Sequence, residues 1–260
     1  MSALYLLVDL AVIAVPLAFS WHPRLRFADR WRDFIPACVI VGALFLAWDV
    51  SFTALGVWGF NDAYLLGPRI AGLPLEEWLF FFCIPYACVF TYHCLGVIGA
   101  GGVGLRNARA LTGILLVLCL ALVVVLREQL YTSITAGLLV VFLVWVLWSR
   151  SEWIGRLWFS FLMLIAPFLI TNGVLTGLGF WKYPLLNTSP EAITDQIVWY
   201  NNAHNLGVRL FSVPLDDFLY AFLLIGLNVA LFEGFAARRA GGQGRLGSLA
   251  TQLEPKRVDR

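Results

Sequence analysis

The chain has 260 residues, of which 60% are hydrophobic and 13% are charged, and its mean hydropathy is +0.82. Soluble domains are usually about 45–50% apolar and about 25% charged. The composition therefore excludes an ordinary soluble domain and predicts an all-α polytopic membrane protein in contact with the lipid bilayer. The net charge of +2 gives no reason to expect nucleic acid as a partner.

Seven runs of the sequence are apolar over the roughly 20 residues that a helix needs to cross a membrane. We expect these spans at residues 3–21, 35–57, 75–98, 108–126, 131–149, 157–179 and 213–235. Fourteen of the 18 Lys and Arg residues fall on one side of this arrangement. The positive-inside rule then predicts a multi-pass protein of the cell membrane, with its N-terminus outside and its C-terminus in the cytoplasm.

The first half of the chain carries acids where a membrane protein rarely keeps them. Asp9 lies in the first span and Asp49 lies in the second. The stretch GLPLEEWLFFF (residues 72–82) places Glu76 and Glu77 at the start of the third. Because an ionisable residue within a span indicates function by default, Asp49 is a candidate. For Asp9, a functional and a structural interpretation remain equally open.

The second half repeats this pattern. The stretch SVPLDDFLYAF (residues 212–222) places Asp216 and Asp217 at the start of the seventh span, and Asn172 lies within the sixth. The five cysteines of the chain all lie in apolar runs and form no C-x-x-C pair. We therefore expect them to be small core residues rather than disulfides or metal ligands.

Two shifts of the sequence reveal an internal repeat. A shift of 140 residues aligns positions 60–82 with 200–222, with nine of 23 residues identical. A shift of 123 residues aligns 49–58 with 172–181 and leaves a 17-residue insertion in the second copy. The matched pairs of interest are Asn61/Asn201, Arg69/Arg209, Trp58/Trp181 and Asp49/Asn172.

The offset of four spans keeps the two copies in the same orientation, as in transporters with parallel repeats. The sequence thus predicts a three-helix repeat at residues 1–100, a linker helix at 101–130 and a second three-helix repeat at 131–237. We expect a disordered cytoplasmic tail at 238–260. Both acid pairs then lie at the same, outer end of the bundle.

The acid pairs have two interpretations. Acids after a proline suit the first turn of a helix, where the helix dipole stabilises them by about 0.3–1 kcal/mol each. A single Ser, Asn or acid would serve that purpose, so two acids in both copies favour chemistry. Crowding and desolvation both favour the protonated form of a carboxyl group, which makes each pair a candidate proton donor. Neighbouring aromatic rings stabilise cations.

We therefore expect catalysis by Glu76, Glu77, Asp216 and Asp217. The residues expected to line the pocket or orient the acids are Asp49, Asn172, Asn201, Arg69, Arg209, Trp58 and Trp181. The sequence contains no metal-ligand cluster and no phosphate-binding loop, so we expect no metal site.

These motifs resemble a known family. The resemblance rests on WDVSFTALGVWGFN (48–61), LPLEEWLFF (73–81), FLITNGVLTG (168–177) and WYNNAHNLGVRLFSVPLDDFLYAFLLIGLNVALFE (199–233). Together they resemble the integral-membrane lycopene cyclases of actinobacteria, archaea and fungi, in the form that fuses two repeats in one chain. The chain departs from the family pattern at Asp216 and Asp217, where a Glu is expected in the pair.

The resemblance implies a carotenoid cyclase that converts the ψ-ends of lycopene to β-rings by protonation, without a cofactor. It also implies lycopene as substrate and other carotenoid-pathway enzymes as partners. A cyclase of a longer (C50) carotenoid or one forming ε-rings is the first alternative. An isoprenoid transporter or binding protein, in which the acids couple protons, is the second.

Overall fold

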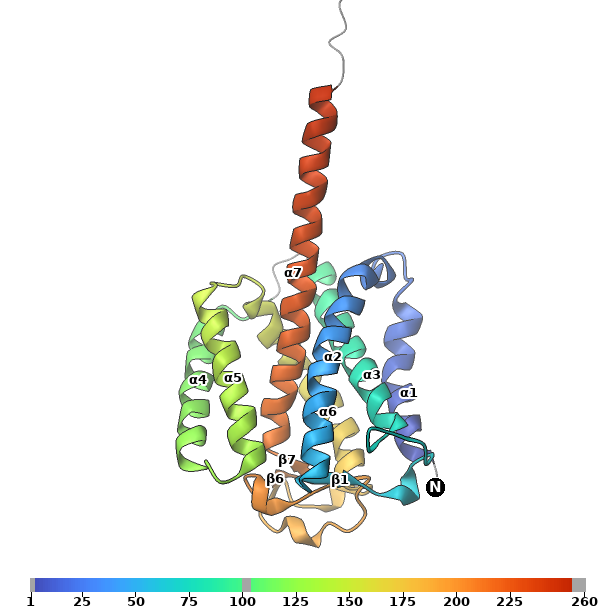
Figure 1. Ribbon diagram of the computed structural model, residues 1–260, viewed down its shortest axis with the longest axis vertical. Helices are drawn as coiled ribbons and strands as arrows, with labels where there is room; N and C mark the ends of the chain where they lie inside the picture. Colours follow the sequence, from blue (N-terminus) through green and yellow to red (C-terminus); the bar gives the residue numbers. More distant parts are fainter. Residues whose placement is uncertain (1–2, 100–103, 254–260) are drawn as a thin grey trace, which may run out of the picture.

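The computed structural model describes residues 3–99 and 104–253, and these form a bundle of seven α-helices (Figure 1). The helices are α1 (Leu4–Phe19), α2 (Trp31–Ala54), α3 (Leu75–Ile98), α4 (Ala108–Val125), α5 (Leu130–Trp148), α6 (Ile154–Thr176) and α7 (Asp216–Leu253). Each overlaps one predicted span, so the all-α membrane fold is confirmed. Six of them, α2 to α7, are long and apolar enough to cross a membrane.

The first helix is shorter than the others. α1 has 16 residues, or roughly 24 Å at 1.5 Å per residue, against a hydrocarbon core of about 30 Å. It nevertheless packs along α3 and is part of the bundle. The predicted span, residues 3–21, is longer than this helix by one residue at its start and two at its end.

The last helix is longer than predicted. The apolar part of α7, Asp216–Gly241, is long enough to cross a membrane. The helix then continues to Leu253 and projects beyond the other helices (Figure 1). The sequence predicts disorder from residue 238, whereas the structure is helical as far as Leu253. Residues 254–260 lie outside the described residues.

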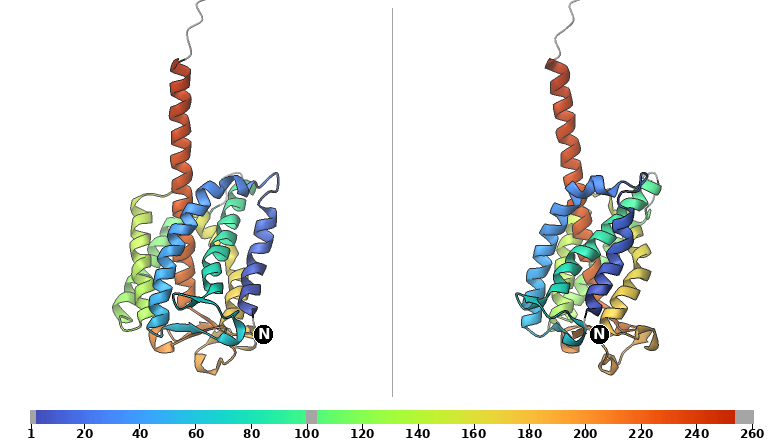
Figure 2. Two further views of the ribbon diagram at one scale, coloured as in Figure 1. Left: turned by 45° about the vertical axis from the view of Figure 1, so that its right-hand side comes forward. Right: turned by 90° about the vertical axis from the view of Figure 1, so that its right-hand side faces the viewer.

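Helices pack both within each half of the chain and between the two halves. α1 and α2 pack on α3, and α5 packs on α7. The halves are joined by crossed contacts, of α2 with α7 and of α3 with α6. α4 packs mainly on α5 at the edge of the bundle (Figure 2), and only 17% of its apolar stretch is buried inside the protein. We propose that this peripheral helix links the two repeats.

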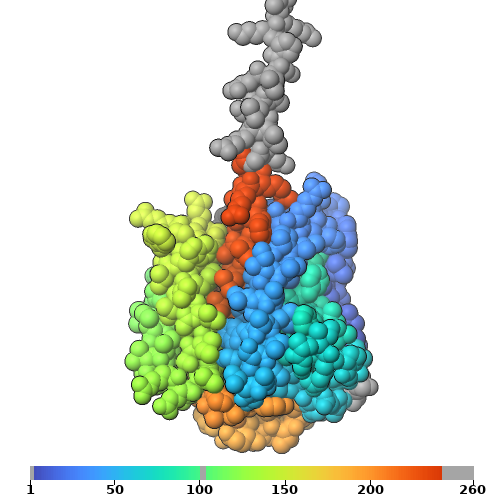
Figure 3. Space-filling model, viewed as in Figure 1, coloured from blue at the N-terminus to red at the C-terminus, as the bar shows by residue number. Residues whose placement is uncertain are grey.

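Short strands close one end of the bundle. They are β1 (Trp58–Phe60), β2 (Arg69–Ile70), β3 (Leu73–Pro74), β4 (Leu186–Asn187), β5 (Val198–Tyr200), β6 (Arg209–Leu210) and β7 (Val213–Pro214). We call residues 58–74 and 180–214 the strand cap. Short 3₁₀ helices occur at Phe27–Arg30, Asp62–Tyr64, Phe180–Lys182, Pro190–Ala192 and Asn202–His204. Figure 3 shows the part from the second copy, in orange, covering the end at which α3 and α7 begin.

The strand cap links the two halves of the chain. β1 pairs antiparallel with β5, and this register sets Trp58 opposite Tyr200. β2 and β3 form a hairpin, and β6 and β7 form the equivalent hairpin in the second copy. The insertion of the second copy supplies β4, which pairs with β6 and widens that hairpin to three strands. The sequence analysis did not predict these strands.

Matched arginines hold both hairpins in the same way. Nη1 of Arg69 and of Arg209 donates to the carbonyl oxygen three residues later, at 2.9 and 3.0 Å. Nη2 donates to the side chain seven residues earlier, Asp62 at 2.6 Å and Asn202 at 3.0 Å. The two copies therefore share hydrogen bonds as well as sequence, and both arginines orient a loop.

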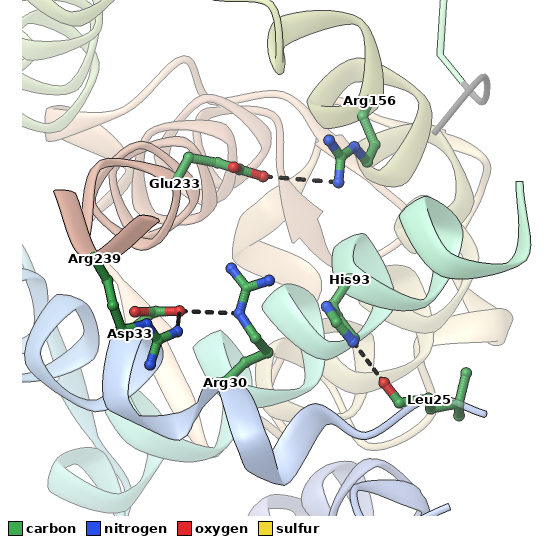
Figure 4. Close-up of polar contacts among 7 residues, drawn as sticks. All are labelled: Leu25, Arg30, Asp33, His93, Arg156, Glu233 and Arg239. Carbon is green, nitrogen blue, oxygen red and sulfur yellow. Dashed lines mark hydrogen bonds and ion pairs between the residues drawn. The ribbon is translucent and has the colours of Figure 1, made fainter. Parts of the chain in front are cut away.

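Away from the strand cap, charged side chains on and beside α2, α6 and α7 form ion pairs (Figure 4). Arg30 and Arg239 both pair with the buried carboxylate of Asp33, which joins α7 to α2. Oε1 of Glu233 in α7 lies 3.7 Å from Nη1 of Arg156 in α6. These ion pairs fix the long last helix against two neighbours, far along the bundle from the strand cap.

Candidate active site

A cavity of about 590 Å³ lies within the bundle. Its walls come mainly from α1, α3, α6 and α7, and they are largely apolar. It extends from Glu77, in the first turn of α3, to Thr91, a length of roughly 20 Å along that helix. The polar and ionisable side chains that line it are Tyr5, Asp49, Trp58, Glu77, Cys88, Thr91, Tyr131, Thr171, Asn172, Tyr200, Asp217 and Tyr220.

The two members of each acid pair lie in different places. Glu77 and Asp217, the second acid of each pair, line the cavity. Glu76 and Asp216 are fully buried outside its lining. Successive residues of a helix point about 100° apart, and here that turn directs the second acid of each pair into the cavity and the first acid away from it.

The first acids hold the preceding loops. Glu76 Oε1 accepts a hydrogen bond from the backbone N–H of Leu66 at 2.6 Å. Asp216 Oδ2 accepts the equivalent bond from Leu206 at 3.1 Å, and its other oxygen accepts from the hydroxyl of Thr132. We therefore propose that Glu76 and Asp216 position these loops, a role other than the helix-start role considered from the sequence.

Glu77 is the centre of a group that we call the first acid centre, which consists of Tyr5, Asp49, Trp58 and Glu77. The Tyr5 hydroxyl donates to Glu77 Oε2 at 2.5 Å. The carboxyl group of Asp49 lies beside that of Glu77, close enough for a hydrogen bond when one of them carries a proton. The indole N–H of Trp58 and the hydroxyl of Thr53 both donate to Asp49 Oδ1.

Asp217 is the centre of the second acid centre, which consists of Tyr131, Asn172, Tyr200 and Asp217. Oδ1 accepts from the Tyr131 hydroxyl at 2.6 Å. Oδ2 accepts from Asn172 Nδ2 at 2.6 Å and from the Tyr200 hydroxyl at 3.1 Å. Burial, with the nearby Asp217, holds the pKa of Tyr200 well above its usual value, so its hydroxyl keeps the proton that it donates. The guanidinium of Arg209 lies over the Tyr200 ring, 5.6 Å from its centre.

The two centres are related but not identical. In each centre a tyrosine hydroxyl donates to the acid. This tyrosine is Tyr5 of α1 in the first centre and Tyr131 of α5 in the second. They differ at the matched position in α2 and α6. Asp49 gives the first centre a second carboxyl group, whereas Asn172 gives the second centre a hydrogen-bond donor.

Aromatic rings join the two centres into one site. The Trp58 ring centre lies 5.1 Å from that of Tyr131 and 6.2 Å from that of Tyr200. The ring of Tyr220 lies 6.3 Å from Trp58 and 6.1 Å from Tyr131. The halves of the chain therefore build a single cavity, with one acid centre from each half.

Besides Glu76 and Asp216, four predicted site residues do not line this cavity, and one of them, Arg209, only lies over the ring of the lining residue Tyr200. Asn201 accepts a hydrogen bond from the backbone of Ala203 in the strand cap. Arg69 lies in its hairpin, and Trp181 is 65% exposed on the surface.

Asp9 is buried near Glu76, and neither of its carboxylate oxygens has a hydrogen-bond partner within the described part of the chain. Among residues 3–99 and 104–253, no group of three or more His, Cys, Asp or Glu side chains could hold a metal ion.

The sequence analysis missed the tyrosines of the site. Tyr5 and Tyr131 are brought into register by a shift of 126 residues, which differs from the shifts that match the other two helices of each repeat. Tyr200 lies in the matched segment, but its counterpart there is Phe60. Only an alignment of the first span with the fifth on its own would have indicated the shared tyrosine.

Comparison with known proteins identifies the family of this fold and site. Residues 2–95 and 128–235 match the family model described as lycopene cyclase. The chain belongs to the lycopene cyclase family. The part that this match leaves out, residues 96–127, contains α4. The resemblance noted in the sequence motifs is thereby confirmed.

Two curated relatives support the same family at lower coverage. A lycopene beta-cyclase of Halobacterium salinarum is 37% identical over 82 residues, which is 31% of this chain and 35% of that protein. A bifunctional lycopene cyclase/phytoene synthase of Phaeosphaeria nodorum is 29% identical over 82 residues, or 32% of this chain and 14% of that protein. The match thus spans about a third of the archaeal lycopene cyclase. No solved structure matches the chain.

Proposed function

We propose that the protein is a carotenoid cyclase that closes the ψ-ends of lycopene to β-rings. Membership of the lycopene cyclase family supports the reaction class, and the name of the archaeal relative favours the β-ring product. The observation that carries the proposal is the meeting of two acid centres in one apolar, aromatic cavity. Such a cavity suits an apolar polyene that must be protonated away from water.

The reaction is an isomerisation whose atoms balance within the substrate. An acid protonates C2 of the terminal double bond and leaves a cation at C1. The electrons of the C5=C6 bond attack C1 and close a six-membered ring, which moves the cation to C5. Loss of the proton from C6 forms the ring double bond of a β-end. These steps require one proton donor and one proton acceptor, and no electron carrier.

The first acid centre fits the proton donor. Asp49 and Glu77 are both buried, and two carboxyl groups in contact away from water strongly disfavour double ionisation. The pair therefore retains one proton between them in our proposal. Glu77 transfers it to the substrate, while Asp49 and Tyr5 stabilise the carboxylate that remains.

The second acid centre fits the proton acceptor. Three donors, from Tyr131, Asn172 and Tyr200, converge on the two oxygens of Asp217. Hydrogen bonds to a carboxylate favour its charged form. Asp217 therefore takes the C6 proton, and its negative charge also favours the cation before that step.

Aromatic faces complete the proposed mechanism. Trp58, Tyr131 and Tyr220 line the same cavity as the two acids, and their ring centres lie 5.1–6.3 Å apart. Ring faces stabilise a desolvated cation by about 2 kcal/mol or more. The apolar walls keep water from capturing the cation as an alcohol.

The test is ring formation in cells that make lycopene, where red pigment turns yellow-orange. We expect Glu77→Gln and Asp217→Asn each to abolish ring formation at normal membrane expression. Glu76→Gln is the matched control, because the amide oxygen still accepts the Leu66 N–H, and it should form rings. Unchanged cyclisation in Glu77→Gln and Asp217→Asn together would reject the proposal.

Product analysis also separates the alternatives. Loss of a proton from C4 instead of C6 would give an ε-ring from the same cation, and a C50 substrate would give a heavier product. Chromatography with mass detection distinguishes all three. A protein that moved or bound lycopene without producing rings would be the transporter or binding protein instead.

We further propose the orientation of the protein in the cell membrane. The excess of Lys and Arg on one side supports a cytoplasmic C-terminus and an external N-terminus. The strand cap and both acid centres then lie toward the outer side. A fluorescent reporter fused after residue 260 should fold and fluoresce, whereas an alkaline phosphatase fused there should be inactive.

A further inference from the structure

The cavity has an opening between two helices. Most residues that line it are buried or half-buried. The three exposed ones are Ala11 of α1 and Pro167 and Ile170 of α6, with Ile170 at 60% exposure. The lining residues contributed by α3 and α7 are all at least partly covered. The opening therefore lies between α1 and α6, which stand next to each other in Figure 2.

The opening faces lipid rather than water. Ala11 lies in the middle of α1, and Pro167 and Ile170 lie well inside α6. Their neighbours on the outer surface are also apolar, including Leu10 at 51% and Met163 at 52% exposure. The end of the bundle next to the acid centres is covered by the strand cap (Figure 3). An apolar molecule dissolved in the bilayer can thus reach the cavity sideways.

The two helices are also suited to separating slightly. Each contains one proline that lines the cavity, Pro16 in α1 and Pro167 in α6. A proline removes one helical hydrogen bond and bends the helix at that point. Ala11 has a small side chain, so no large group fills the gap from the α1 side.

We propose that the gap between α1 and α6, which we call the lateral mouth, admits one end of an acyclic polyene from the bilayer. During the reaction the reacting end lies between the acid centres, and the rest of the polyene leaves through the mouth into lipid. This inference rests on the proposed function for the identity of the ligand. It assigns Ala11, Pro167 and Ile170 to substrate entry.

Tryptophan substitution tests the mouth. Ala11→Trp and Ile170→Trp should narrow it, while Leu10→Trp and Met163→Trp add the same ring to lipid-facing positions outside the cavity lining. With lycopene in liposomes, we expect the mouth variants to lose about tenfold or more in kcat/KM and the controls to stay within about twofold. Equal losses in both sets, or no loss in either, would overturn the proposal.

A binding measurement separates this inference from the proposed chemistry. A photoreactive benzoylphenylalanine at position 11, combined with Glu77→Gln, should form a covalent adduct with lycopene on illumination. The same group at position 10 should form little adduct. Efficient labelling at 10 and none at 11 would reject the mouth, even if the wild-type protein forms rings. Absence of rings in the wild type, with labelling at 11, would instead reject the proposed function alone.

Discussion

At the scale of single residues, Asp49 and Asn172 account for the main difference between the two acid centres. They occupy matched positions of the repeat, yet Asp49 lies beside the carboxyl group of Glu77 while Asn172 donates to Asp217 at 2.6 Å. The first centre thus has two acids for one shared proton, and the second has one acid with several donors. This difference separates a donor from an acceptor in our proposal.

Replacing Asp49 by Asn should make the first centre resemble the second. Glu77 would then no longer share a proton with a second acid, and a hydrogen bond from the new amide would favour its carboxylate form and weaken it as a proton donor. We expect ring formation per enzyme to fall by about 10²- to 10⁴-fold, the usual contribution of acid–base catalysis. Asp62→Asn, at an exposed surface ion pair, is the control and should leave the rate unchanged. Full activity of Asp49→Asn would contradict the assignment.

Tyr220 allows the ring and the hydroxyl of a cavity residue to be tested separately. Its hydroxyl forms no hydrogen bond to another residue in the described ranges, unlike those of Tyr5, Tyr131 and Tyr200. The matched residue of the first copy is Phe80, which also lines the cavity.

We therefore expect the Tyr220 ring to matter more than its hydroxyl. Tyr220→Phe should keep ring formation within about threefold, whereas Tyr220→Leu should lower it by roughly tenfold, as expected when a cation–π contact is lost. Steady-state rates in liposomes measure both. A large loss in Tyr220→Phe would instead assign a chemical role to the hydroxyl.

The sequence indicated the acids of the site but could not show which member of each pair faces the cavity. Both members follow the same proline at a helix start, so local sequence treats them alike. The choice depends on how α3 and α7 are rotated in the bundle, and their neighbours in the bundle set this rotation. Trp181 could not be separated from its match Trp58 either, because one lies exposed in a 3₁₀ helix and the other lies buried in β1.

At the scale of elements, the helices were predictable and the strands were not. Each helix is a long apolar run, and length and hydropathy are enough to find it. The strands have two or three residues each, and β1 pairs with a partner about 140 positions away. No local pattern of that length distinguishes a strand from a loop.

The contact between α5 and α7 positions the second acid centre and can be tested at Gly226. A Cβ atom added there would lie 2.7 Å from the ring of Phe142, which is only 4% exposed and has little room to move. Tyr131 lies in α5 and Asp217 lies in α7. Separating these helices would therefore also lengthen the hydrogen bond from the Tyr131 hydroxyl to Asp217.

Gly226→Val should therefore destabilise the protein by about 1–3 kcal/mol, as overpacking usually does. Ring formation should fall together with the unfolding temperature in detergent. Gly113→Val in α4 is the matched control, since an added Cβ there meets no atom within 4 Å. Equal unfolding temperatures for the two variants would show that α5 and α7 adjust freely.

At the scale of the whole molecule, the two halves depend on each other. The hairpins and the tyrosine–acid contacts occur in both halves. This supports our proposal that residues 1–100 and 131–237 are parallel repeats joined by the linker at 101–130. The family match also omits most of that linker. Yet Trp58 from one half contacts Tyr131 and Tyr200 from the other, so neither half encloses the site alone.

One shared cavity has a consequence for a substrate with two identical termini. If only one terminus is cyclised each time the substrate binds, the first product released is monocyclic. This product then competes with lycopene for the cavity in the next turnover. The ratio of monocyclic to bicyclic carotenoid should therefore rise as expression of the protein is lowered. Pigment chromatography across a graded induction series measures this ratio. Bicyclic pigment alone at every level of induction would mean that both termini are closed before release.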